Sequence, residues 1–156
     1  MTAWVLRLDP DADAVQLLAA RAHHLRRWAI ARGEYPDGRA GYLRWRTALK
    51  RMHAEDVAAV LADADYDQRT ISRVQAIVRK DGLASDPVVQ THEDALCLVF
   101  LTTQFDDFIE RLGADKTVDV VRKTVAKMSD RGRAEALALP LSPAAVDVVT
   151  RALTVD

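Results

Sequence analysis

Apolar residues recur every three or four positions along most of the chain, which is the spacing of helices that bury one face. The longest stripe of this kind contains Trp45, Leu49, Met52, Val57 and Val60. The spacing predicts helices over residues 11–30, 42–61, 71–80, 87–111, 115–128 and 143–153. Glycine and proline residues separate these segments, and no alternating strand pattern or glycine-rich phosphate loop occurs in the sequence. We therefore expect an all-α fold, a compact single-domain helical bundle over residues 1–156.

The start of the fourth predicted helix decides how Asp94 is interpreted. Asp86 followed by Pro87 is a good start signal, because aspartate caps a helix and proline fits its first position. The segment "THED" offers an alternative start, in which Thr91 caps the helix and Asp94 completes a capping box. We prefer the start at Pro87. Asp94 then lies in mid-helix at helical spacing from Leu98 and needs a partner for its carboxylate.

Two histidines on other predicted helices are candidate partners for that carboxylate. His24 precedes Trp28 by four residues and so borders the apolar side of its helix, and His53 follows Leu49 by four. His24, His53 and Asp94 together would form a metal-binding triad that leaves coordination positions open for water or substrate. The alternative for each histidine is an ordinary hydrogen bond in the core. His23 is expected to point away from this site, and His92 to face away from Asp94 and lie at the surface.

Charge is balanced over the whole chain but not locally. The sequence has 22 Lys and Arg against 23 Asp and Glu, whereas residues 21–51 contain nine basic residues and two acidic ones. Arg46, Lys50 and His53 are spaced by four and three, which aligns them along one helix. With Lys80, these cations predict binding of a phosphate-containing small molecule; a solvated face is the alternative. Nucleic acid is a further possible partner.

Cysteine usage and apolar runs bear on location. The sequence has one cysteine, Cys97, so no internal disulfide can form, and its longest apolar run, "ALCLVFL", is far shorter than a membrane span. Nothing near Met1 has the form of a signal peptide. A cytoplasmic protein without membrane contact is expected.

Several segments carry a resemblance to a known family. They are "ARAHHLRRW", "RAGYLRWRTALKRMHAE", "RVQAIVRK", "DPVVQTHEDALCLVFL" and "VRKTVAKMSDRG". Together they resemble an uncharacterised domain-of-unknown-function family, number four-two-zero-two, whose members extend upstream of the position of Met1. This resemblance covers almost the whole chain and implies no established activity.

The order of motifs also resembles, more distantly, the HD-domain superfamily of metal-dependent phosphohydrolases. "LLAARAHHL" is similar to the helix with the paired motif, "RMHAEDVAAVL" supplies a further histidine, and "QTHEDALCLVF" supplies the final aspartate, Asp94. The chain departs from the pattern at His24, where an aspartate is expected, and at Arg79-Lys80, where histidines are frequent. The helix with the superfamily's first histidine would lie at or before Met1. These departures imply one weakly held divalent ion or none.

Two functions follow from these observations. In the first, the protein is an HD-like metal-dependent phosphohydrolase that acts on a nucleotide or another phosphate ester. His24, His53 and Asp94 would hold one divalent ion, and Arg46, Lys50 and Lys80 would hold the substrate. In the second, an inactive HD-like domain binds a nucleotide, RNA or an acidic partner through a basic cleft.

Overall fold

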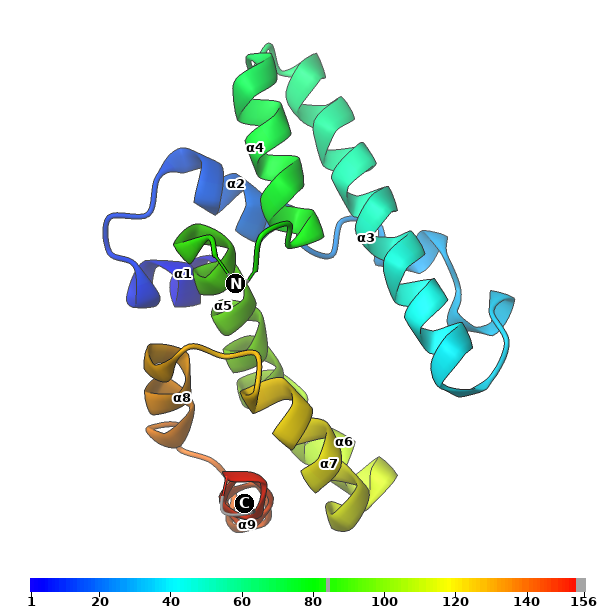
Figure 1. The fold of residues 1–156 in the computed structure, drawn as a ribbon, viewed down its shortest axis with the longest axis vertical. Coiled ribbons are helices and arrows are strands. Elements are labelled where there is room, and N and C mark those ends of the chain that lie inside the picture. Colours follow the sequence, from blue (N-terminus) through cyan, green and yellow to red (C-terminus); the bar gives the residue numbers. More distant parts are fainter. Residues whose placement is uncertain (84, 154–156) are drawn as a thin grey trace. The chain divides into compact units, whose positions relative to one another are not determined.

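The computed structural model describes residues 1–83 and 85–153, and their regular elements are all helical (Figure 1). The α-helices are α1 (Thr2–Leu8), α2 (Ala14–Ala22), α3 (Gly38–Asp63), α4 (Gln68–Arg79), α5 (Pro87–Thr103), α6 (Phe105–Leu112), α7 (Ala114–Val125), α8 (Asp130–Leu137) and α9 (Pro143–Leu153). Two short 3-10 helices, η1 (Arg27–Ala29) and η2 (Arg32–Glu34), lie between α2 and α3. The all-α prediction is confirmed.

The chain divides into two compact units. The first, here called the central unit, contains Thr2 and residues 11–89. The second, here called the terminal unit, contains Met1, residues 3–10 and the chain from residue 90 onward.

The core of the central unit lies among α2, α3 and α4. Helices α3 and α4 run antiparallel along one another, and α2 packs against α4 (Figure 1). Their shared core consists of small and β-branched side chains: Ala19, Ala22, Ala54, Val57, Leu61, Ile71, Val74, Ile77, Val78 and Val89. The small alanines of α2 allow its backbone to approach α4 closely.

Helix α2 is shorter than its apolar pattern predicts. Asp13 caps its start, where it accepts a hydrogen bond from the Gln16 amide, but the helix ends at Ala22 instead of continuing to residue 30. Arg26 then adopts a left-handed conformation, with φ of 52°. Helical spacing therefore does not extend to Trp28. The prediction placed Trp28 on the buried side of the helix, but its side chain is 81% exposed.

Helix α3 begins earlier than predicted, at Gly38. A Cβ atom on Gly41 would lie 1.8 Å from the Pro36 carbonyl oxygen, so the chain can pass this close only at a glycine. Farther along, Leu49 and Val57 are buried as predicted, but Val60 is 56% exposed. The predicted apolar stripe of α3 is therefore correct only in part.

The terminal unit contains α6, α7 and α9 in mutual contact. Its buried apolar residues include Leu98, Phe105, Ile109, Val118, Val121, Val148 and Val149. The helix predicted over residues 87–111 is interrupted at Gln104, so that α5 and α6 are separate. Helices α1 and α8, which the sequence pattern did not predict, are joined by an ion pair of 2.7 Å between Arg7 and Glu135.

None of the helices in the described part of the chain combines the length and the hydrophobicity that crossing a bilayer requires.

Candidate anion-binding site

His24 and His53 lie close together in the central unit. Their ring centroids are 6.2 Å apart, and the ring of His23 lies 4.6 Å from that of His24. His53 is 4% exposed and His23 is 8% exposed, whereas His24 is exposed. The expectation for the two adjacent histidines is thus reversed, because α2 ends at Ala22 and the turn that follows buries His23 instead of His24.

One backbone contact fixes the orientation of the His53 ring. Its Nδ1 lies 2.7 Å from the Leu25 carbonyl oxygen, and because a carbonyl only accepts, Nδ1 must be the donor. Burial is the main cause that lowers the pKa of His53, so the ring is neutral at neutral pH and its Nε2 carries a lone pair. Nε2 is closed off from solvent and has no hydrogen-bond partner among the described residues.

Positive charges surround His24. The pKa of His24 is lowered to about 4. The largest cause is the loss of hydration among its neighbours, and like-charge repulsion adds to it from Arg27, His53, Arg46 and Lys80. Lys80 reaches this position as the residue that ends α4, in a left-handed conformation with φ of 62°. Cations from three separate segments therefore converge on one exposed imidazole.

Aromatic rings hold the two arginines of this cluster. The Arg27 guanidinium lies 5.0 Å from the centroid of the Trp45 ring, and that of Arg46 lies 5.8 Å from the Tyr42 ring. The two rings are 5.9 Å apart, Arg46 donates a 3.0 Å hydrogen bond to the Tyr42 hydroxyl, and Trp45 donates one of 3.1 Å to the Ile30 carbonyl. Such contacts restrain the guanidinium groups without neutralising them.

Neither arginine has a carboxylate within ion-pair distance among the described residues. Partial desolvation lowers the pKa of Arg27, and electrostatic repulsion by the charge of Arg46 lowers it further. Arg26, by contrast, pairs with Asp56 at 3.3 Å. We call the group of Arg27, Arg46, Lys80, His24 and His53 the cation cluster.

The structure brings together part of the predicted substrate-binding set. Arg46 and Lys80 are both among the charges that lower the pKa of His24. Lys50 lies one turn after Arg46 on α3. Arg27 was missed, although it stands three residues after His24, a spacing that would have brought the two side chains together on the expected helix as well.

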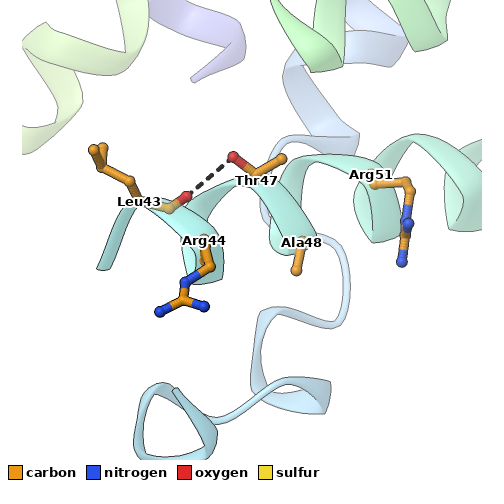
Figure 2. A pocket seen from close by; sticks show the side chains of 5 residues that line it. All are labelled: Leu43, Arg44, Thr47, Ala48 and Arg51. Atoms are coloured by element: carbon orange, nitrogen blue, oxygen red, sulfur yellow. Dashed lines mark hydrogen bonds between the residues drawn. The ribbon is translucent and has the colours of Figure 1, made fainter. Parts of the chain in front are cut away.

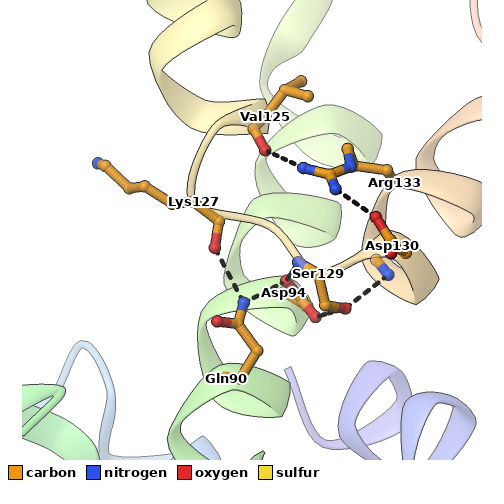
Figure 3. Close-up of polar contacts among 8 residues, drawn as sticks. Gln90, Asp94, Val125, Lys127, Ser129, Asp130 and Arg133 are labelled. Atoms are coloured by element: carbon orange, nitrogen blue, oxygen red, sulfur yellow. Dashed lines mark hydrogen bonds and ion pairs between the residues drawn. The ribbon is translucent and has the colours of Figure 1, made fainter. Parts of the chain in front are cut away.

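Asp94 belongs to the terminal unit, where it joins α5 to the start of α8 (Figure 3). Its carboxylate accepts hydrogen bonds from the Ser129 amide at 3.0 Å, the Ser129 hydroxyl at 2.5 Å and the Gln90 side chain at 2.9 Å. The Ser129 hydroxyl in turn accepts from the Gly132 amide at 3.0 Å and so caps α8. Asp94 is 2% exposed and has protein partners at both oxygens.

The preferred start of α5 is confirmed. Helix α5 begins at Pro87, and Asp86 accepts a hydrogen bond of 3.0 Å from the Val88 amide. Asp94 is therefore in mid-helix, and Ser129 supplies much of the partner set that its burial requires. His92, expected at the surface, is 2% exposed.

The predicted metal triad is divided between the two units. His24 and His53 are close to one another in the central unit, and Asp94 lies in the terminal unit. Over the described residues, no group of three or more histidine, cysteine or acidic side chains is arranged to hold a metal ion. The triad stays a prediction from the sequence.

A separate groove lies along one face of α3 (Figure 2). Its volume is about 340 Å³, and its lining comes from α3 alone: Leu43, Arg44, Thr47, Ala48 and Arg51. The Thr47 hydroxyl donates to the Leu43 carbonyl at 3.0 Å, so its hydrogen is used within the helix. No member of the cation cluster lines this groove.

The chain was compared with known proteins. A family model described as "Domain of unknown function (DUF4202)" matches residues 1–149. No curated protein and no solved structure matches the chain.

Proposed function

We propose, for a chain that belongs to the DUF4202 family, that the central unit binds the phosphate group of a small molecule at the cation cluster. The observation that carries this proposal is the convergence of Arg27, Arg46 and Lys80 on His24. A phosphate group would accept hydrogen bonds from the guanidinium groups and relieve their mutual repulsion.

The two arginines of the cluster carry like charges in a partly desolvated place. The charge of Arg46 lowers the preference of Arg27 for the charged form, and neither arginine is neutralised by a described carboxylate. An anion between them removes this unfavourable interaction. The rings of Trp45 and Tyr42 hold both guanidinium groups before binding, which lowers the entropy lost when the anion arrives.

Calorimetric titration with inorganic phosphate and with a nucleoside monophosphate tests the proposal. The double variant Arg27→Gln, Arg46→Gln should bind at least about tenfold more weakly, and its affinity should depend less on salt. The matched control is Arg39→Gln, Arg44→Gln, which removes the same charge from exposed positions outside the cluster. Equal losses in the two double variants would refute specific binding at the cluster.

A second candidate function is the metal-dependent hydrolysis of a phosphate ester, in line with the distant HD-domain resemblance. It is favoured by His53, whose Nε2 is left without a partner by the contact between Nδ1 and Leu25. Metal-bound histidines commonly donate their other nitrogen to a carbonyl in this way. Both His24 and His53 have a lowered pKa and are neutral at neutral pH, as ligands must be.

In this second candidate, the three ligands predicted from the sequence, His24, His53 and Asp94, would hold one divalent ion, which would supply an activated water when bound. Arg46, Lys80 and Lys50 would hold the phosphate ester. Thermal melting with excess Mn²⁺ or Zn²⁺ and with chelator tests it on wild type and on Asp94→Asn. A metal-dependent rise in melting temperature is expected for wild type alone. Identical responses would remove Asp94 from the site.

A further inference from the structure

The cation cluster contains one hydrogen-bond acceptor that is closed off from solvent. Arg27, Arg46 and Lys80 offer only N–H groups, and the neutral ring of His24 is exposed, so water can reach its lone pair. His53 Nε2 offers a buried lone pair. That nitrogen is closed off from solvent and has no partner among the described residues. A buried acceptor in this state loses its hydration without compensation, so a group that enters the site and carries a hydrogen would restore the missing bond.

The candidates for such a group differ in charge and in hydrogen content. A cation at Nε2 is opposed by the positive charge of Arg27, which acts on His53 directly. A tetrahedral anion without a hydrogen satisfies the arginines but brings an oxygen lone pair towards the lone pair of Nε2. A phosphate group with one hydrogen satisfies both, since its other oxygens accept while its hydroxyl donates.

We infer that His53 makes the cation cluster selective for the hydrogen-bearing form of a phosphate group over fully deprotonated tetrahedral anions. This inference rests on the proposed binding of phosphate at the cluster. The contact between His53 Nδ1 and the Leu25 carbonyl keeps the acceptor nitrogen on the opposite edge of the ring. Leu25 and His53 act together as the specificity element, and the arginines supply the affinity.

Hydrogenphosphate and sulfate provide a matched pair of probes. At mildly alkaline pH both ions are tetrahedral dianions, and only hydrogenphosphate carries a hydrogen. Wild-type protein should bind hydrogenphosphate about tenfold more tightly than sulfate in calorimetric titrations at equal ionic strength. The dianion of methyl phosphate, which carries no hydrogen, should bind like sulfate.

The variant His53→Asn separates the acceptor from the rest of the ring. The asparagine amide nitrogen can still donate to the Leu25 carbonyl in place of Nδ1, but nothing replaces Nε2. The affinity ratio of hydrogenphosphate to sulfate should fall to about one in this variant. Arg46→Gln is the control, since it should weaken both ions and preserve the ratio.

The outcomes distinguish this inference from the proposed function. Equal binding of the two ions by wild type, or an unchanged ratio in His53→Asn, would overturn the role of His53 and leave phosphate binding intact. If neither hydrogenphosphate nor sulfate binds, phosphate binding at the cluster is overturned, and the selectivity with it. The wild-type comparison needs no variant and therefore decides the matter even where His53→Asn is unstable.

Discussion

Replacement of Asp94 by asparagine should destabilise the terminal unit. The Asp94 carboxylate accepts three hydrogen bonds at 2.5–3.0 Å from Ser129 and Gln90, and the residue is 2% exposed. Asparagine keeps one carbonyl oxygen but turns the other acceptor into an N–H₂ group. At least one donor of Ser129 or Gln90 then loses its acceptor, and the remaining bonds lose the assistance of the negative charge.

The magnitude follows from these bonds. A hydrogen bond to a charged group contributes about 1.5–3 kcal/mol, and an unsatisfied buried donor costs about 1–3 kcal/mol. Because the three bonds share one carboxylate, their effects are not additive, and we expect a loss of about 2–3 kcal/mol in the free energy of unfolding. An aspartate that served only as a helix cap would lose only a few tenths of a kcal/mol, because asparagine also caps well.

Urea unfolding followed by far-ultraviolet circular dichroism measures this loss. Asp107→Asn is the matched control, because Asp107 is exposed in the same unit and its replacement should change stability by less than about 0.5 kcal/mol. The measurement is made with chelator, so that a metal does not contribute. A loss for Asp94→Asn no larger than that of the control would refute the structural role assigned to the Ser129 contacts.

Three further predictions concern other contacts. Gly132→Ala should lower the free energy of unfolding, measured in urea, by about 1–3 kcal/mol, because the new Cβ would lie 2.6 Å from Asp94 Cγ. The control Gly33→Ala places its Cβ in open space and should change the free energy of unfolding little. The hydrogen bond from Arg73 lowers the pKa of Asp86, so the ionised carboxylate stabilises the protein at pH values above the usual pKa of 3.8. The wild type should therefore melt at a higher temperature than Asp86→Asn, and this difference should vanish as pH falls through the lowered pKa. In the double variant Arg27→Gln, Arg46→Gln, the pKa of His24 should rise from about 4 towards 6.5 in an NMR titration. An unchanged pKa would show that the two arginines do not lie close enough to His24 to repel its proton.

Helical periodicity predicts this fold well where a helix buries a continuous stripe. Helix α4 is an example, since Ile71, Val74, Ile77 and Val78 are all buried at the predicted spacing. The start of α5 was also predictable, because Asp86 and Pro87 act through local geometry alone.

The pattern fails where a helix ends without a glycine or proline. Nothing in "AHHLRRW" marks the end of α2 at Ala22, so helical spacing placed His24 and Trp28 on a buried side. Arg27 was also missed, although its spacing of three from His24 was a usable signal; its contact with Trp45 follows from the fold and not from the spacing. Arg46 and Lys80 were proposed from the sequence as residues that hold a phosphate group, but their distance in sequence gave no geometry relative to His24.

The partner of Asp94 shows a second limit of sequence reasoning. A buried carboxylate in mid-helix requires hydrogen-bond donors, and this requirement was correctly inferred from its apolar neighbours. The sequence does not say which donors fold against it, and histidines were the conspicuous candidates. Ser129, which lies 35 residues away and carries no charge, supplies two of the bonds.

The pKa of His24, measured by NMR with and without inorganic phosphate, tests the central claim most directly. In the free protein, desolvation and the surrounding cations keep this pKa near 4. A phosphate group bound among Arg27, Arg46 and Lys80 adds negative charge beside the ring, so saturating phosphate should raise the His24 pKa by one unit or more, about 1.4 kcal/mol per unit. A His24 pKa that is the same with and without saturating phosphate would contradict phosphate binding at the cation cluster.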